Sequence, residues 1–266
     1  MQDRVIVPTY DRPEMLWLCL EHIARSPDSK HLSVMVYADA HVGHTTPREE
    51  IEQVVDKFPH LNIQVGFRNP HPFHGNSFNV LMAFKDAFYE PQVRYVFMIE
   101  DDVMVHPQFF QWHWTAHAAK TLGCSIGVIK EPQYGPYASL GVCFRREMLG
   151  LIVPHCQVAY FHNLRMYCKT RFAPSKFDCE QDGLFCRVLI GHSIAWPPIP
   201  YAQHVGWYGY HRKKSIRPVG TLAERYYQVK HVLTSATALR QWVKDFGDIK
   251  VLQLSATSGT VSGAAE

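Results

Sequence analysis

The first hundred residues alternate short apolar runs with amphipathic segments, and no other feature restricts the fold as much. Strand signals, mostly short apolar runs, cover residues 4–8, 32–38, 61–67 and 93–99. Segments with apolar residues every three or four positions follow the first three runs and predict helices. Three strand–helix units in series predict right-handed crossovers and a mostly parallel sheet with helices on both faces. In such α/β sheets, ligands bind at the carboxyl ends of the strands.

Two of the predicted helices have clear start signals. Thr46, Pro47 and Glu49 have the order of an N-cap, a first-turn proline and a capping-box carboxylate. Thr221 and Glu224 repeat the capping-box spacing before the last predicted helix.

Between these helices the regular alternation of strand and helix signals is lost beyond residue 122. The Gly, Pro, Tyr and Trp content of the chain from there to residue 220 favours a mixed sheet with long loops around a pocket.

The composition is that of a folded chain. Of the 266 residues, 47% are hydrophobic and 19% are charged, which excludes a disordered or coiled-coil protein. The net charge of +3 is too small to indicate nucleic acid or a membrane by itself. The longest apolar stretches are far shorter than the ~18 residues of a membrane span, and the N-terminus has no signal-peptide core. We therefore expect a cytoplasmic protein with no membrane span.

Three adjacent carboxylates follow the last of the apolar runs. Glu100, Asp101 and Asp102 come directly after the run that ends at Ile99. Adjacent carboxylates repel one another, so a divalent cation or a cationic ligand would stabilise them at a strand end. Hard oxygen ligands suit Mg²⁺ or Mn²⁺, and such an ion could bridge the two phosphates of a nucleotide. A solvated acidic turn is the alternative, and the three residues alone favour neither.

Three motifs resemble those of one enzyme family. The run VIVPTYDRPEML, Val5 to Leu16, resembles the opening strand and turn of GT-A-fold nucleotide-sugar glycosyltransferases, especially the large family-two group. The run YVFMIEDDVMVHPQFF, Tyr95 to Phe110, resembles the D-x-D strand and following helix of that fold, and its EDD form is also similar to N-acetylglucosaminyltransferase I. Between them, HGNSFNVLMAF resembles the Gly-containing segment that starts the helix below the nucleotide. The resemblance covers about residues 4–211, and the order of the motifs is more specific than each motif.

The resemblance implies an α/β GT-A fold, with a Rossmann-like half followed by a mixed-sheet half. It implies a metal-dependent glycosyltransferase that uses Mn²⁺ or Mg²⁺ and a nucleotide-sugar donor, with a UDP-sugar favoured. Transfer to a hydroxyl acceptor with inversion at the anomeric carbon is expected. Residues 1–106 would form the nucleotide-sugar-binding half and residues 107–220 the acceptor and catalytic half. A C-terminal helix at residues 221–254 and a flexible tail at residues 255–266 would follow.

Residues that match the motifs take donor-binding roles by this resemblance. Four would line the nucleoside, with the arginine near the phosphates or the base: Pro8, Thr9, Tyr10 and Arg12. Asp39, after the second predicted strand, would accept the imide N–H of the base, and a loop-starting aspartate is the alternative. Arg68 and Asn79 match positions around the ribose and the phosphates. Glu100 and Asp101 would contact the ribose or metal-bound water, and Asp102 would bind the metal directly.

A second acidic site lies in FDCEQDGLFCRVLIGHSI. Inverting members of the family take their general base from an acidic pair at the head of a helix. Glu180 and Asp182 are one residue apart here, whereas an adjacent pair is the commoner pattern, and of the two we expect Asp182 to be the base. The base must lie within about 3 Å of the acceptor hydroxyl, and a position near a helix start keeps it ionised. Plain N-capping is the alternative. Tyr134, Tyr137 and Ser139 are candidates for shaping the donor-sugar pocket.

The segment after residue 200 supplies a histidine and a basic loop. His204, in the order His-Val-Gly, resembles the late H-x-G of the family, whose histidine binds the metal, and an imidazole suits Mn²⁺ better than Mg²⁺. Residues 211–231 hold six Lys or Arg and one acid, a net charge of +5. Arg212 and Lys213 would approach the diphosphate and stabilise the leaving group. A solvated surface loop is the alternative.

Two other functions stay open on the sequence alone. A nucleotidyltransferase or phosphohydrolase would use the same metal site, and a sugar-nucleotide-binding module would lack catalysis. The acceptor could be a glycan, a protein or a hydroxymethylated base in DNA, and the basic segment 211–231 makes DNA worth testing.

Overall fold

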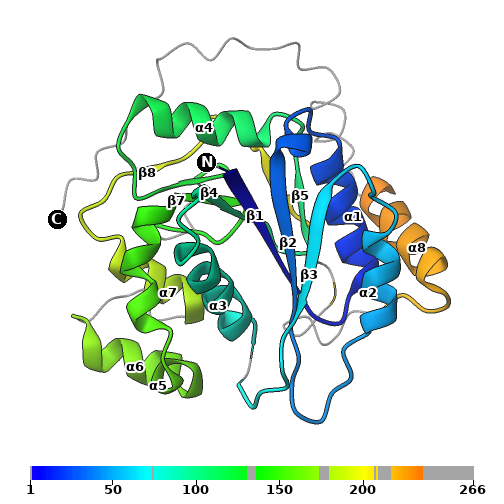
Figure 1. Cartoon of the computed structure of the whole chain (residues 1–266), viewed down its shortest axis with the longest axis horizontal. Coiled ribbons are helices and arrows are strands. Elements are labelled where there is room, and N and C mark those ends of the chain that lie inside the picture. Colours follow the sequence, from blue (N-terminus) through cyan, green and yellow to red (C-terminus); the bar gives the residue numbers. More distant parts are fainter. Residues whose placement is uncertain are drawn as a thin grey trace.

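The protein is represented by a computed structural model that describes residues 2–73, 75–130, 136–173, 180–206, 208 and 217–235. Its centre is a seven-stranded sheet with the order β3-β2-β1-β4-β7-β6-β8 (Figure 1). These strands are β1 (Gln2–Thr9), β2 (Leu32–Ala38), β3 (Asn62–Phe67), β4 (Val93–Met98), β6 (Cys124–Ile126), β7 (Val142–Arg145) and β8 (Ile194–Ala195). β1 to β4 are parallel, β7 is antiparallel to β4 and β6, and β8 is parallel to β6. The predicted mostly parallel sheet is confirmed.

Helices cover both faces of the sheet (Figure 1). α1 (Pro13–Ala24) and α2 (Arg48–Val55) lie on one side, and α3 (Ser77–Phe88) and α7 (Glu180–Val188) lie on the other. The remaining helices are α4 (Phe109–Ala119), α5 (Val158–His162), α6 (Leu164–Arg171) and α8 (Leu222–Ser235), with 3₁₀ turns η1 (Ser29–His31), η2 (Arg146–Leu151) and η3 (Val153–His155). Within the described ranges, none of these helices has the length and apolar character that crossing a membrane requires.

The core is centred on β4. Val96, Phe97 and Met98 in this strand, and Ile99 directly after it, are completely buried. A strand that is apolar on both faces must be covered by helices on both faces, so the sequence predicts a central strand. The structure confirms this position, because β4 lies between β1 and β7.

The topology brings the predicted site residues to one edge of the sheet. The strand order reverses between β1 and β4, so their carboxyl ends form a crevice of the kind that binds ligands in α/β folds. A second, two-stranded sheet lies beside this crevice and pairs β5 (Val103–Val105) with β9 (Ala202–His204). Val103 pairs with His204, and the Val205 N–H donates to the Asp102 carbonyl at 2.8 Å. This pairing joins the acidic strand end to a segment a hundred residues later.

One of the two predicted helix caps is confirmed. The Thr221 N–H donates to Glu224 Oε2 at 2.8 Å, and the Glu224 N–H donates to the Thr221 hydroxyl at 3.3 Å, so α8 begins with a capping box. The predicted cap at Thr46 is wrong. α2 begins at Arg48 without a side-chain cap, and the Thr46 hydroxyl donates to the Asp39 carbonyl at 2.8 Å. A tertiary hydrogen bond to the loop after β2 has replaced the local one.

Candidate functional site

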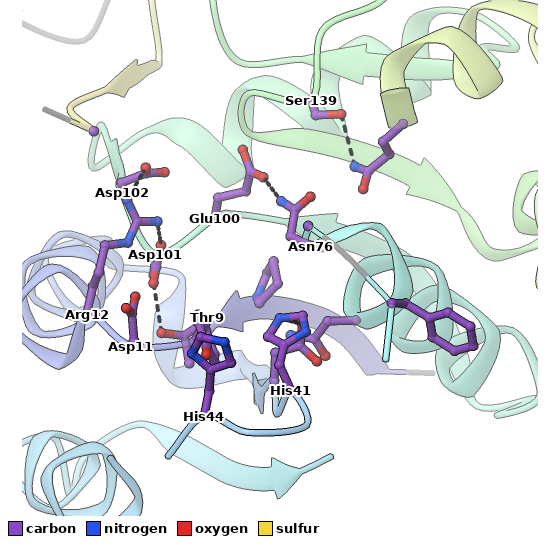
Figure 2. Close-up of a pocket in the computed structure, with 18 of the residues that line it drawn as sticks. Thr9, Asp11, Arg12, His41, His44, Asn76, Glu100, Asp101, Asp102 and Ser139 are labelled. Atoms are coloured by element: carbon purple, nitrogen blue, oxygen red, sulfur yellow. Dashed lines mark hydrogen bonds and ion pairs between the residues drawn. The ribbon is translucent and has the colours of Figure 1, made fainter. Parts of the chain in front are cut away.

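A cavity of about 540 Å³ opens at the carboxyl ends of β1, β2 and β4. Its volume is within the range of small-molecule sites. Figure 2 shows its walls, with the acidic strand end, Ser139 and the pair His41 and His44 on different sides. Most of the site residues predicted from the sequence line it: Pro8, Thr9, Tyr10, Arg12, Asp39, Asn79, Glu100, Asp101, Asp102, Asp182 and His204. The structure therefore brings together residues from both halves of the chain.

Arg12 is the counter-ion of the acidic strand end. Its guanidinium donates to Asp101 Oδ1 and, at 2.8 Å, to Asp102 Oδ2 (Figure 2). The Thr9 hydroxyl donates to the other oxygen of Asp101 at 2.8 Å. The resemblance places Arg12 near the phosphates or the base, whereas its contacts in the structure are with these carboxylates. Arg12 lies in the turn between β1 and α1, so a residue of the first sequence motif holds the carboxylates of the second motif, Asp101 and Asp102, in place.

The three carboxylates have different electrostatic environments. Burial raises the pKa of Glu100 strongly, and the neighbouring Asp102 and Asp182 raise it further. Burial also raises the pKa of Asp101, to about 6, against the opposing effect of Arg12. Burial opposes ionisation of Asp102 as well, but His204 and Arg12 together lower the pKa of this group. Asp102 is therefore the carboxylate of the three that stays ionised over the widest pH range.

Asp102 and His204 form a pair that fits a divalent cation. His204 Nε2 lies 3.3 Å from Asp102 Oδ2, and both side chains line the cavity. A Cβ at Gly206 would lie 2.3 Å from Asp102 Oδ2 and 2.8 Å from His204 Nε2, so only glycine leaves room for both ligand atoms. A carboxylate oxygen and an imidazole nitrogen are both donor types that divalent metal ions accept. The glycine of the H-x-G motif thus has a steric role.

Asp182 lies in the first turn of α7 and reaches the same cavity. Its Oδ1 accepts a hydrogen bond from the Ser139 hydroxyl, and Gln181 Nε2 donates to the same hydroxyl oxygen at 3.3 Å. Ser139, a candidate for the donor-sugar pocket, lines the cavity as predicted. Tyr137 is buried against Phe185 instead, with 4.8 Å between the ring centroids. The side chain of Glu180 and all of Tyr134 are outside the described part of the chain, so Asp182 is the described member of the acidic pair.

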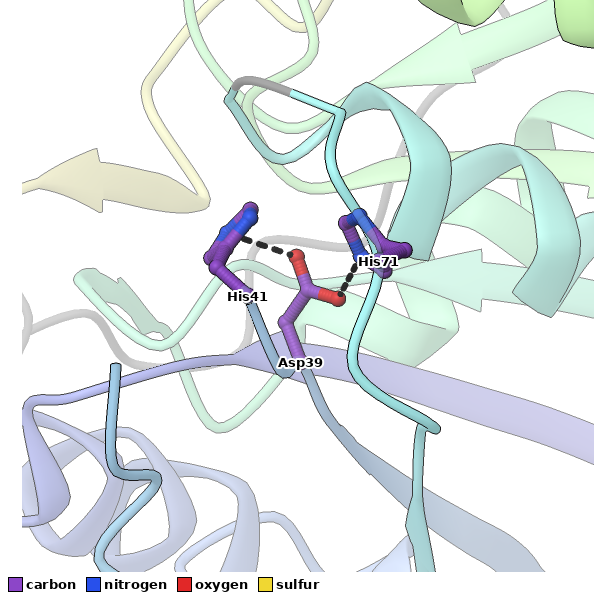
Figure 3. A group of neighbouring side chains, drawn as sticks. All are labelled: Asp39, His41 and His71. Atoms are coloured by element: carbon purple, nitrogen blue, oxygen red, sulfur yellow. Dashed lines mark hydrogen bonds and ion pairs between the residues drawn. The ribbon is translucent and has the colours of Figure 1, made fainter. Parts of the chain in front are cut away.

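Asp39 forms a cluster with two histidines that the sequence analysis did not identify. Its Oδ1 lies 2.7 Å from His71 Nε2 and accepts from the Ala40 N–H at 3.0 Å, while its Oδ2 lies 3.4 Å from His41 Nε2 (Figure 3). Burial raises the pKa of Asp39 and lowers the pKa of His41. His41 follows β2 and His71 follows β3, and these strands are parallel neighbours. The rule that strand ends meet at one edge could have indicated this pair.

Asn76 also contributes to the wall. Its amide donates to Glu100 Oε1 at 2.7 Å, and it precedes α3 in the Gly-containing segment (Figure 2). The motif resemblance located this segment without singling out the residue.

Arg68 is turned toward the protein. Its guanidinium donates to Asn79 Oδ1 at 3.1 Å and to Asp86 Oδ2 at 3.0 Å, and it lies over the Tyr37 ring at 4.4 Å. Arg68 does not join the residues that line the cavity in the described structure, so its contribution there is through Asn79.

The basic segment 211–231 divides into two parts. Arg212 and Lys213 lie outside the described residues. The cations that are described form ion pairs with acids of the first fifty residues: Arg217 with Asp11, Arg225 with Glu14 and Glu50, and Lys230 with Glu21. These charges are compensated within the chain, and most of them hold α8 against α1. The described part of the segment therefore gives no support to binding of DNA.

Comparison with known proteins identifies the fold. No protein-family model matches the sequence, and no curated protein matches it. Residues 1–349 of TarS from S. aureus in complex with UDP-GlcNAc superpose with a TM-score of 0.52 at 15% identity, over 92% of this chain and 71% of TarS 1–349. Mannosyltransferase PcManGT from Pyrobaculum calidifontis, in complex with GDP-Man and Mn²⁺, superposes with a TM-score of 0.53 at 14% identity, over 92% of this chain and 84% of PcManGT. Glycosyltransferase GlyE of Streptococcus pneumoniae TIGR4 superposes with a TM-score of 0.50 at 8% identity, over 92% of this chain and 64% of GlyE. The expected GT-A fold is confirmed.

Proposed function

We propose that the protein is a metal-dependent glycosyltransferase that moves a sugar from a nucleoside diphosphate to a hydroxyl acceptor. One observation carries the proposal. A single cavity holds the Asp102–His204 pair, which fits a divalent cation, and Asp182, which fits a general base. The fold supports it, because glycosyltransferases with nucleotide-sugar ligands share this architecture.

The donor would lie along the ends of β2, β1 and β4. Asp39 would accept the N–H of the base, with a uracil base favoured, and Tyr10 packs edge-on against the neighbouring His41 at 4.8 Å. Glu100 and Asp101 would contact the ribose, and Asp102 and His204 would hold the cation. When bound, Mn²⁺ or Mg²⁺ would neutralise the negative charge of the diphosphate. Arg12 keeps Asp101 and Asp102 in place through its two hydrogen bonds.

Asp182 would act on the acceptor. Its carboxylate takes the proton of the acceptor hydroxyl, and the oxygen attacks the anomeric carbon as the bond to the diphosphate breaks. The nucleoside diphosphate leaves with the bonding electrons, and attack from the opposite face inverts the anomeric centre. The Ser139 hydroxyl holds Asp182 in place through a hydrogen bond to its Oδ1.

The test separates donor binding from chemistry. We expect nucleotide sugars with Mn²⁺ to raise the melting temperature, because ligands that bind the native state stabilise it. Asp102→Asn should lose the Mn²⁺-dependent part of this shift and should lose transfer. Asp182→Asn should keep the shift and lose transfer to a panel of glycan, protein and hydroxymethylated DNA acceptors. Asp56→Asn, on the exposed end of α2, makes the same chemical change far from the cavity and serves as the control.

Two results would contradict the proposal. Normal transfer by Asp182→Asn would remove the assigned base. Release of pyrophosphate instead of a nucleoside diphosphate would indicate nucleotidyl transfer at the same acidic site.

A further inference from the structure

A second group of metal-ligating side chains lies outside the Asp102–His204 pair. Asp39, His41 and His71 each offer one ligand atom, and these atoms lie within 4.8 Å of one another. Asp39 and His71 are buried, and His41 is half-buried and faces the cavity. Figure 3 shows the carboxylate between the two imidazole rings, with one oxygen directed to each. The described residues contain no other group of three such side chains.

We propose that Asp39, His41 and His71 bind a transition-metal ion of the Zn²⁺ class, at a site separate from the Asp102–His204 pair. Two imidazole nitrogens and one carboxylate oxygen, with an open fourth position, are the donor set of many zinc sites. With metal–ligand bonds of about 2.0–2.1 Å, tetrahedral ligand atoms lie about 3.4 Å apart. The two histidine nitrogens contact different oxygens of Asp39, His71 Nε2 at 2.7 Å from Oδ1 and His41 Nε2 at 3.4 Å from Oδ2. All three ligand atoms lie within 4.8 Å of one another, so rotation of the side chains would bring them to the separations that one ion requires.

The donor set separates this site from the acidic one. Asp102 and His204 lie beside two further carboxylates, Glu100 and Asp101, and oxygen-rich surroundings of this kind suit Mn²⁺ or Mg²⁺. Two imidazoles favour Zn²⁺, Co²⁺ or Ni²⁺. Asp39 also supplies the negative charge that keeps a divalent cation in a buried position. The two sites therefore differ in their donor sets, with two imidazoles at Asp39 and one at Asp102.

The backbone fixes the ligands before any ion binds. His41 and His71 form an isolated parallel bridge, the Val42 N–H donates to the His71 carbonyl at 3.1 Å, and the His71 N–H donates to the Ala40 carbonyl at 3.1 Å. The His71 ring packs against Phe78, with 4.1 Å between the centroids. Because the loops after β2 and β3 are already joined, binding would order few further groups, and preorganisation of this kind increases affinity.

The site lies in the wall of the proposed donor cavity, so its occupant affects the donor. If the proposed function holds, Asp39 accepts the N–H of the base, and an ion on the same carboxylate competes with it. Zn²⁺ would then weaken donor binding, whereas Mn²⁺ at Asp102 and His204 would strengthen it. Binding of the ion itself does not depend on the proposed function.

The experiment is a titration of the metal-free full chain with Co²⁺, followed by Zn²⁺. Tetrahedral Co²⁺ with nitrogen and oxygen ligands absorbs visible light, and Zn²⁺ that takes the same site removes the absorption. We expect one equivalent of Co²⁺ to give this spectrum in the wild type and in Asp102→Asn. His41→Ala and His71→Ala should each weaken the binding by about 100-fold or more. His60→Ala, which removes an exposed histidine elsewhere, should bind as the wild type does.

The outcomes separate this site from the proposed activity. Retention of the Co²⁺ spectrum by both His41→Ala and His71→Ala, or its loss in Asp102→Asn alone, would overturn the proposal. Absence of a tetrahedral spectrum in the wild type would overturn it as well. If His71→Ala does not fold, His41→Ala decides the result, because His41 is less buried. Sugar transfer is measured separately, and its absence would leave the Co²⁺ result intact.

Discussion

Replacement of Gly206 by alanine tests the metal pair at a residue that binds nothing itself. The added Cβ would lie 2.3 Å from Asp102 Oδ2, 2.8 Å from His204 Nε2 and 3.1 Å from Asp102 Cγ. The backbone of Gly206 is outside the left-handed region, so alanine adopts it without strain. The perturbation is therefore confined to the two proposed ligands.

The size of the effect follows from these distances. Ordinary van der Waals contact begins at 3.4 Å, so the Asp102 oxygen, at 2.3 Å from the new atom, has to retreat by about 1 Å. A misplacement of about 1 Å in a catalytic site can cost about 100-fold in rate. We expect kcat/KM of Gly206→Ala to fall by about this factor, and the Mn²⁺ concentration for half-maximal rate to rise.

Sugar transfer at increasing Mn²⁺ measures both quantities, and a thermal melt checks the fold. Gly150→Ala is the matched control, because its Cβ would meet Phe88 at 3.5 Å, an ordinary contact far from the metal pair. A Gly206→Ala protein with wild-type rate and Mn²⁺ dependence would show that Asp102 and His204 do not hold the ion.

Three further predictions address the base, the cation and one buried histidine. Ser139→Ala removes a hydrogen bond to a charged group, worth about 1.5–3 kcal/mol, so kcat should fall about 10- to 100-fold; a wild-type kcat would show that this contact does not support the reaction. Removal of divalent cations by a chelator should stop transfer, and Mn²⁺ should restore it; full activity in the chelator would contradict a metal-dependent reaction. His117 is buried beside Arg145, and burial lowers the pKa of its imidazole to about 4. Between pH 6.5 and pH 4 this histidine is therefore protonated in the unfolded chain and neutral in the folded chain. Stability is then lost as pH falls, by about 2 kcal/mol at pH 5 for this group. The His117→Gln amide can still donate to the Cys143 carbonyl. Urea unfolding at pH 8 and at pH 5 measures how much unfolding free energy each protein loses between the two pH values, and the loss should be smaller by about 2 kcal/mol in His117→Gln than in the wild type. An equal loss in both proteins would refute the linkage.

The fold could be predicted because its signals are local and repeated. β1, β2 and β4 contain continuous apolar runs, β3 alternates apolar and polar residues, and the helices between them have the period of one buried face. Asp39 and Glu100 to Asp102 directly follow predicted parallel strands, and the carboxyl ends of such strands meet at one edge of the sheet. The motifs of the resemblance lie at these strand ends, so most of the predicted site lines one cavity.

The rest depends on contacts that no local pattern encodes. The position of His71 beside Asp39 requires the knowledge that β2 and β3 are neighbours and in register. The Thr46 hydroxyl had a local partner available and took a tertiary one. Arg12 could serve a phosphate or a carboxylate by its chemistry, and its two hydrogen bonds to Asp101 and Asp102 form only in the folded chain.

The charges of the basic segment illustrate the same limit. Counted along the sequence, residues 211–231 are strongly positive. In the structure, Arg225 and Lys230 face Glu14 and Glu21 on α1, which are two hundred residues away in the chain. A net charge counted over a window of sequence describes the surface only when its partners lie in that window.

The docking of α8 on α1 has a consequence for deletion experiments. None of the described residues of α8 lines the cavity, yet Tyr226 stacks on Trp17, and Arg225 pairs with Glu14, two residues after Arg12. Truncation of the chain within α8 would remove from α1 the ring of Tyr226 and the positive charges of Arg225 and Lys230. α1 begins directly after Arg12. Loss of sugar transfer by a protein truncated within α8 is therefore the expected result of destabilising α1.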